Sequence, residues 1–169
     1  MFTPSAATMP ARGLFRLAVV ALATLGLLVS ALAGSTPAHA ATGLPPVTKL
    51  TSMATGFALD SNFDGSVYGI SPNTGRFQKW IVVPSDNDTV VLRNSRTAFC
   101  LDSNTEGHAY TSYCNGGSFQ KWTVFPSDFG SVVLQNLATG LVLDGNGEGT
   151  VYTHDYNKGS YQKWFPVAA

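Results

Sequence analysis

The sequence repeats itself with a fixed period of 42 residues. Three tetrapeptides of the form Q-x-W with an aromatic residue in front (FQKW, FQKW and YQKW) end at Trp80, Trp122 and Trp164. A Leu-Asp pair keeps the same step upstream, with its aspartates at Asp60, Asp102 and Asp144. Such a period is typical of folds in which each unit is one supersecondary element that packs against its copies. We therefore expect three equivalent units, over residues 47–88, 89–130 and 131–169.

Each unit reads as four short strands. In the middle unit, aromatic or β-branched runs cover 89–93, 98–102, 108–113 and 119–125, and turn sequences rich in Asn, Ser, Gly and Pro separate them. No unit shows a helical period of useful length. The pattern predicts an all-β fold of 12 strands. We expect the first strand, 47–52, to meet the last, 162–167, because that pairing closes a threefold body and leaves no open edge.

The first 40 residues have a different character. Arg12 and Arg16 precede an uncharged apolar run of 16 residues, 17–32, which is followed by Ala38-His39-Ala40. This order is typical of a secretory signal peptide cleaved after Ala40. The run is shorter than the roughly 20 residues that a spanning helix needs. We therefore predict a secreted, extracellular protein whose mature chain has a short leader at 41–46 and no membrane span.

Charge and cysteine content narrow the possible partners. The chain carries 10 Lys and Arg against 10 Asp and Glu, and removal of the two signal arginines leaves the mature chain with a net charge of −2. A protein without basic excess lacks the electrostatic footprint of a phosphate-binding surface, so nucleic acid is not an expected partner. Two cysteines fall short of a four-cysteine zinc framework. We expect no metal site and no other cofactor.

Three Q-x-W elements in phase, each with a Leu-Asp about 18 residues upstream, resemble the ricin B-type β-trefoil lectin family over residues 47–169. The resemblance implies a β-trefoil, which is a six-stranded barrel capped by three hairpins. It implies a lectin that binds a polysaccharide or glycoconjugate non-covalently at up to three equivalent pockets, and we expect it to be a monomer. It also implies a disulfide inside the middle unit, between Cys100 and Cys114.

The resemblance suggests which residues hold the sugar. The family's aspartate accepts hydrogen bonds from sugar hydroxyls, and it corresponds here to Asp60, Asp102 and Asp144. The aromatic residue that normally stacks on the sugar is replaced by Ile70, Ser112 and His154. Period-two alternation places a tyrosine two residues earlier on the same face. We hypothesise that these tyrosines replace the aromatic platform, although packing of the hairpin tip is the alternative: Tyr68, Tyr110 and Tyr152.

Further polar candidates lie near the Q-x-W elements, and His154 joins them in the third unit. The glutamines can touch a ligand, but satisfying backbone groups inside the unit is their expected role: Gln78, Gln120 and Gln162. The loop asparagines are candidates that turn chemistry also explains: Asn73, Asn115 and Asn157. The family often has Asn directly before the Gln. Its replacement by Phe77, Phe119 and Tyr161 removes one sugar hydrogen bond, and the three tryptophans are expected core anchors.

A calcium site and a catalytic site both find less support. The segment 60–65 matches the opening of a calcium-binding loop, but the twelfth position is Ser71 and not glutamate, and a tight hairpin turn explains the pattern. The mature chain keeps only His108 and His154 and has no nucleophile-elbow or zinc-protease motif. Identical aspartates repeated three times do not provide the two unlike environments of an acid/base pair. We therefore expect no catalytic residues and no enzyme activity.

One alternative function stays open. A β-trefoil can also act as a protein-binding module or protease inhibitor, with variable loops as its contact surface. The loops at 84–88 and 126–130 are the candidates for such a surface.

Overall fold

The structure is a computed structural model that describes residues 43–169, so the signal peptide predicted at 1–40 lies outside the described residues. In this part of the chain, each repeat contributes four strands. The strands are β1 (Val47–Ser52), β2 (Ala58–Ser61), β3 (Val67–Ile70), β4 (Trp80–Pro84), β5 (Thr89–Asn94), β6 (Cys100–Ser103), β7 (Ala109–Ser112), β8 (Trp122–Pro126), β9 (Val132–Asn136), β10 (Val142–Gly145), β11 (Val151–His154) and β12 (Trp164–Ala168). The short 3-10 turns are η1 (Arg76–Gln78), η2 (Ser118–Gln120), η3 (Asp128–Gly130) and η4 (Ser160–Gln162).

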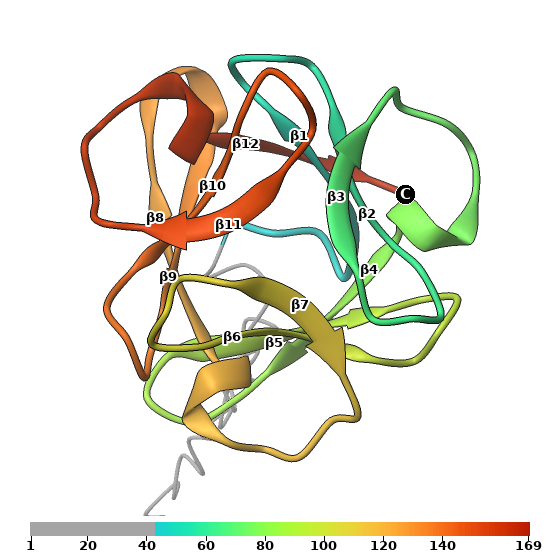
Figure 1. Ribbon diagram of the computed structural model, residues 1–169, viewed down its shortest axis with the longest axis vertical. Helices are drawn as coiled ribbons and strands as arrows, with labels where there is room; N and C mark the ends of the chain where they lie inside the picture. The colour runs from blue at the N-terminus through green and yellow to red at the C-terminus, as the bar shows by residue number, and fades with distance from the viewer. Residues whose placement is uncertain (1–42) are drawn as a thin grey trace, which may run out of the picture. The chain divides into compact units, whose positions relative to one another are not determined.

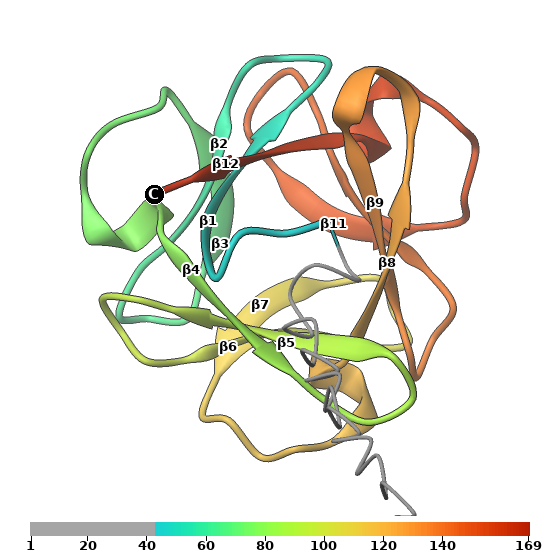
Figure 2. The ribbon, with the colours of Figure 1, turned by 180° about the vertical axis from the view of Figure 1, so that it is seen from behind.

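Six of these strands close into an antiparallel barrel. Around the ring the pairs are β1–β4, β4–β5, β5–β8, β8–β9, β9–β12 and β12–β1. The pairing of β1 with β12 runs from Thr48 opposite Ala168 to Ser52 opposite Trp164, so the first and last strands meet as expected. The other six strands form the hairpins β2–β3, β6–β7 and β10–β11. Figure 1 shows β3, β7 and β11 arranged around the centre, and Figure 2 shows the barrel strands from behind. The predicted 12-stranded β-trefoil is confirmed.

The tryptophans anchor the core in a threefold pattern. Trp80, Trp122 and Trp164 are at most 1% exposed. Each indole N–H donates to the carbonyl of the leucine that precedes the site aspartate, at 3.0 to 3.1 Å. These bonds satisfy the one polar atom of each buried indole ring. Leu44, within the predicted leader, is also buried in this core. Among residues 43–169, no helix combines the length and apolar character that crossing a membrane requires.

The fourth strand of the second and third repeats begins later than the sequence pattern predicts. Strands were expected at 119–125 and 162–167, but β8 begins at Trp122 and β12 at Trp164. The residues before them form 3-10 turns, in which the Gln120 N–H donates to Gly117 O and the Gln162 N–H donates to Gly159 O. The second strand of the middle unit also begins late, because Ala98 has a φ of 64°, which is incompatible with an extended strand.

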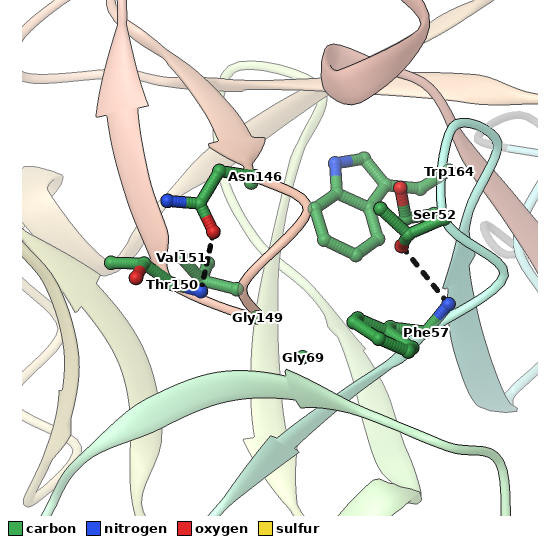
Figure 3. Close-up of a pocket in the computed structure, with 10 residues that line it drawn as sticks. Ser52, Phe57, Gly69, Asn146, Gly149, Thr150, Val151 and Trp164 are labelled. Atoms are coloured by element: carbon green, nitrogen blue, oxygen red, sulfur yellow. Dashed lines mark hydrogen bonds between the residues drawn. The ribbon is translucent and has the colours of Figure 1, made fainter.

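The three hairpins are tied to one another around the threefold axis. The backbone N–H groups of Gly69, Thr111 and Thr153 donate to the carbonyls of Gly149, Gly65 and Gly107, respectively, each at 2.7 Å. Each bond joins the second strand of one hairpin to the turn of a neighbouring hairpin. Figure 3 shows one of these junctions, where Gly69 and Gly149 lie beside Phe57 and Trp164 around a small cavity of about 10 Å³. The glycines therefore permit close contact between backbones.

The loop between β8 and β9 places a phenylalanine in a strained conformation. Phe129 has a φ of 55° and is 86% exposed, so no packing compensates for the left-handed backbone. Its counterpart one repeat earlier is Asn87, which has a φ of 54° and which tolerates this conformation better. We therefore expect Phe129→Asn to raise the free energy of unfolding by about 1 kcal/mol, measured by urea denaturation. A variant of unchanged or lower stability would contradict the assignment of strain.

Candidate functional site

The site aspartates and the hairpin tyrosines face each other across the hairpins. In each hairpin the aspartate lies directly opposite the tyrosine, as shown by the pairs Asp60–Tyr68, Asp102–Tyr110 and Asp144–Tyr152. Directly opposed residues of an antiparallel pair project from the same face of the sheet, with Cβ atoms about 4.5–5.5 Å apart. The local strand pairing therefore brings one carboxylate and one phenol together in every repeat.

The glutamines of the Q-x-W elements hold the loop and the carboxylate in place. Gln120 is fully buried; its Nε2 donates to Asp102 Oδ2 at 2.8 Å and to Tyr113 O at 3.0 Å, while its Oε1 accepts from Asn115 N at 2.9 Å. This network satisfies buried backbone groups and fixes the orientation of the aspartate. Gln120 therefore lies beneath the site and supports it.

The third repeat reproduces this network, and the first repeat differs in detail. Gln162 Nε2 donates to Asp144 Oδ2 and to Asp155 O, both at 2.8 Å. In the first repeat the Gln78 amide donates to Ser71 O at 3.1 Å. Burial of its carboxyl group raises the pKa of Asp60 above the ordinary value, because a low-dielectric environment disfavours the charged form.

The tyrosine hydroxyl groups stay protonated over the physiological pH range. Burial and the charge of the opposing aspartate raise the pKa of each phenol above its ordinary value: Tyr68, Tyr110 and Tyr152. Tyr161 also contributes to the raised pKa of Tyr152, and both tyrosines line a cavity in the third repeat. Each hydroxyl therefore keeps its one proton, which Tyr152 donates to Gly145 O at 3.3 Å, and it keeps lone pairs that can accept a hydrogen bond.

These residues line open cavities in the second and third repeats. The cavity of the third repeat has a volume of about 330 Å³ and that of the second about 190 Å³. The third-repeat cavity is lined by Asp144, Gly145, Asn146, Gly147, Tyr152, Asn157, Gly159 and Tyr161. The second-repeat cavity is lined by Asp102, Ser103, Asn104, Tyr110, Asn115, Gly117 and Phe119. Both cavities thus combine the predicted aspartate, tyrosine and asparagine.

The loop asparagines also have a structural role. The Oδ1 atoms of Asn73, Asn115 and Asn157 each accept from a glycine N–H two residues later, at 2.7 Å. This is an Asx-turn, which uses the side-chain oxygen and leaves the amide nitrogen available. The turn chemistry considered in the sequence analysis is therefore present, and it positions the amide group at the edge of the cavity.

His154 lies apart from these groups. Its side chain is exposed, its Nδ1 lies 3.4 Å from Asp155 O, and it is absent from the residues that line the third-repeat cavity. The structure therefore brings together the aspartate, tyrosine and asparagine of the third repeat but not its histidine.

One class of cavity residue was not predicted from the sequence. Phe119 and Tyr161, which directly precede the buried glutamines, line the cavities and are 40% and 43% exposed. From the sequence, this position was interpreted only as the loss of the asparagine that the family often has there. The signal that was available is that all three repeats carry an aromatic residue there, and an aromatic face is suited to the apolar side of a ligand.

The loops that resemble a calcium motif are hydrogen-bonded turns. Asn104 Oδ1 accepts from the backbone N–H groups of Glu106 at 3.1 Å and His108 at 3.0 Å, and the other two hairpins repeat these bonds. Within residues 43–169, no three His, Cys, Asp or Glu side chains are grouped closely enough to hold a metal ion.

Comparison with known proteins identifies relatives of this fold. A family model described as a ricin-type beta-trefoil lectin domain matches residues 46–164. The designed threefold symmetric protein ThreeFoil is 24% identical with a TM-score of 0.69, over 74% of this chain and 100% of that protein. SeviL, solved with the asialo-GM1 saccharide, is 19% identical with a TM-score of 0.63, over 73% and 98% of the respective chains. A mosquitocidal holotoxin is 18% identical with a TM-score of 0.67, over 73% of this chain and 17% of the toxin. No curated protein sequence matches.

Proposed function

Since this chain belongs to the ricin-type β-trefoil lectin family, we propose that it is a secreted, monomeric lectin that binds glycans non-covalently at up to three equivalent pockets. The family supports carbohydrate binding in general, and the solved complex of SeviL contains a saccharide. A domain of this family is a carbohydrate-binding module without a catalytic role, which agrees with the use of the same aspartate in all three repeats. The disulfide in the second repeat is compatible with an oxidising, extracellular environment.

The observation that carries the proposal is the recurrence of one polar and aromatic cavity in two repeats. In the third repeat, Asp144 supplies a hydrogen-bond acceptor and the amide of Asn157 supplies a donor, while the hydroxyl of Tyr152, which donates to Gly145 O at 3.3 Å, can accept a hydrogen bond from a ligand. Tyr152 and Tyr161 supply aromatic surface in the same cavity. A sugar presents hydroxyl groups at its edge and C–H groups on its face, so this combination matches both parts of the ring.

Several weak pockets on one chain suit a repetitive ligand. Simultaneous binding at two pockets raises the apparent affinity for a polysaccharide or a glycosylated surface without any new contact. We therefore expect stronger retention on a polymeric glycan than on the corresponding free oligosaccharide.

The proposal is tested by removing the site carboxylates. The triple variant Asp60→Ala, Asp102→Ala, Asp144→Ala is expected to lose binding on a glycan array and in affinity electrophoresis through xylan and galactan gels. A hydrogen bond to a charged group contributes about 1.5–3 kcal/mol, which corresponds to a roughly 10- to 100-fold loss of affinity at each pocket. Near-UV circular dichroism verifies that the variant is folded, and the corresponding triple Asn variant is used if the Ala variant is not.

A matched control distinguishes loss of the site carboxylates from a general change in the net charge of the protein. Asp64, Glu106 and Glu148 are exposed carboxylates four residues after the site aspartates. Replacing these three by Ala changes the net charge equally and is expected to leave binding intact. Absence of glycan binding by the unmodified protein, or equal effects of the two triple variants, would contradict the proposal.

A further inference from the structure

The three repeats differ at two positions beside the aromatic residue of the Q-x-W element. The first position lies three residues after the site aspartate and holds Phe63, Thr105 and Gly147 in repeats 1, 2 and 3. The second position lies in the loop between the first two strands of the following repeat. It is Arg96 next to repeat 1, Ala138 next to repeat 2 and Ala54 next to repeat 3. Repeat 1 therefore has two large side chains where the other repeats have small ones.

Equivalent backbone bonds place the second position in the same way in all three repeats. The N–H of the residue just before it, which is Ser95, Leu137 or Met53, donates to the carbonyl of the Q-x-W lysine at 2.8 to 2.9 Å. The loop of the following repeat is thus tied to the Q-x-W turn each time. Differences between the repeats at this place come from the side chains and not from the path of the backbone.

In repeat 1 the large side chains form a cluster over the site aromatic. The rings of Phe63 and Phe77 meet edge to face, with centroids 5.5 Å apart and an interplanar angle of 86°. The guanidinium carbon of Arg96 lies 5.5 Å from the centroid of Phe63 and 6.0 Å from that of Phe77, within the range of a cation–π contact. Phe77 is accordingly half-buried, whereas its counterparts Phe119 and Tyr161 are exposed.

In repeat 3 the same place is open. Gly147 has no side chain, and a Cβ added there would lie 3.8 Å from Tyr161 Oη, so a larger residue at 147 would stand beside the ring that lines the cavity. The cavity of about 330 Å³ falls within the range of about 300–1,000 Å³ typical of small-ligand pockets, whereas the 190 Å³ cavity of repeat 2 is smaller than that range.

We infer, resting on the proposed lectin function, that the three pockets are unequal: repeat 3 holds the principal glycan site, repeat 2 a weaker one, and the Phe63–Phe77–Arg96 cluster closes repeat 1. The residue three positions after the site aspartate, Phe63 in repeat 1 and Gly147 in repeat 3, sets the access to these two pockets. A glycan ring that lies on Tyr161 in repeat 3 finds the equivalent ring in repeat 1 covered by the protein's own side chains.

Reciprocal exchange of this residue tests the inference. Gly147→Phe introduces the residue of repeat 1, and the loop accommodates it because Gly147 does not have a positive φ and the added Cβ makes only an ordinary contact. We expect the variant to bind the probe sugars, lactose and xylotriose, at least tenfold more weakly in isothermal titration calorimetry. The double variant Phe63→Gly, Arg96→Ala gives repeat 1 the residues of repeat 3 and is expected to add one binding site per chain.

Three equivalent glycine amides report on each pocket separately. Gly75, Gly117 and Gly159 occupy the same place in the three repeats, and the last two line cavities. In NMR titrations of the unmodified protein, we expect the Gly159 amide to shift at the lowest sugar concentration, Gly117 at a higher one, and Gly75 not at all. In the double variant, Gly75 is expected to shift as well.

The outcomes separate this inference from the proposed function. If the probe sugars and all glycans of an array fail to bind, the lectin proposal fails and the inference fails with it. If sugar binds but Gly75 shifts with Gly159, or Gly147→Phe binds as tightly as the unmodified protein, the inference is overturned while the lectin proposal stands.

Discussion

Replacing Gly107 by alanine is expected to lower the free energy of unfolding by about 3 kcal/mol or more. Gly107 has a φ of +86°, and an added Cβ would lie 2.7 Å from the backbone oxygen of Thr153. The left-handed conformation costs an alanine about 1–2 kcal/mol, and overpacking against an atom that is unable to move costs typically about 1–3 kcal/mol more. The Thr153 N–H also donates to the Gly107 carbonyl, so any shift that relieves the contact strains a bond between two hairpins.

The chain offers a matched control for this prediction. Gly140 also has a positive φ, of +73°, but an added Cβ would meet nothing within 4 Å. Its counterpart in the middle repeat is Ala98, which already adopts a φ of 64°. Gly140→Ala therefore isolates the conformational cost and should lose only about 1 kcal/mol in urea denaturation. Equal losses for the two variants would show that the close approach of the hairpins contributes nothing.

Removal of the disulfide between Cys100 and Cys114 is expected to cost about 3 kcal/mol. The bridge, implied by the family resemblance, is present in the structure and joins residues 14 positions apart, with their Cα atoms 5.1 Å from each other. In the chain-entropy model, cross-linking a loop of about 15 residues removes about 3 kcal/mol of disorder from the unfolded state. Urea denaturation of Cys100→Ala, Cys114→Ala measures the loss.

A second variant distinguishes the contribution of the covalent cross-link to stability from the contribution of side-chain packing. The counterparts of these cysteines in the third repeat are Val142 and Tyr156, and in that repeat they hold the same place without a covalent bond. Cys100→Val, Cys114→Tyr is expected to recover part of the loss through packing, while the entropic part remains. A double Ala variant as stable as the unmodified protein would refute a stabilising role for the bridge.

Much of the architecture could be predicted because the same sequence pattern occurs in all three repeats. The 42-residue step of Trp80, Trp122 and Trp164, together with the aromatic and β-branched runs separated by turn sequences in each unit, predicted four strands per repeat. The pairing of β1 with β12 followed from the need to leave no edge. The predicted strand ends were less accurate. The side chain of Gln120 forms hydrogen bonds with the backbone of the preceding loop at Tyr113 and Asn115, and residues 118–120 form a 3-10 turn where a strand was expected.

The candidate site was predicted only in part. The aspartate was a candidate because of the family resemblance, and the tyrosine because period-two alternation places it on the face of the aromatic platform; the structure pairs the two directly across one hairpin. Phe119 and Tyr161 were not identified as cavity residues. The direction of these two side chains depends on the 3-10 turn that precedes the fourth strand. The alternation of side chains along a strand does not apply in such a turn.

The sequence by itself determined the threefold β-sheet body, the buried tryptophans and the family to which the chain is similar. Each of these properties follows from short sequence patterns that recur in every repeat. Only the tertiary structure decided how the repeats differ. Arg96 reaches Phe63 and Phe77 from the following repeat, and Gly147 leaves the equivalent place open beside Tyr161. Such contacts join residues that are distant in the sequence, so they depend on how the closed barrel brings one repeat against the next.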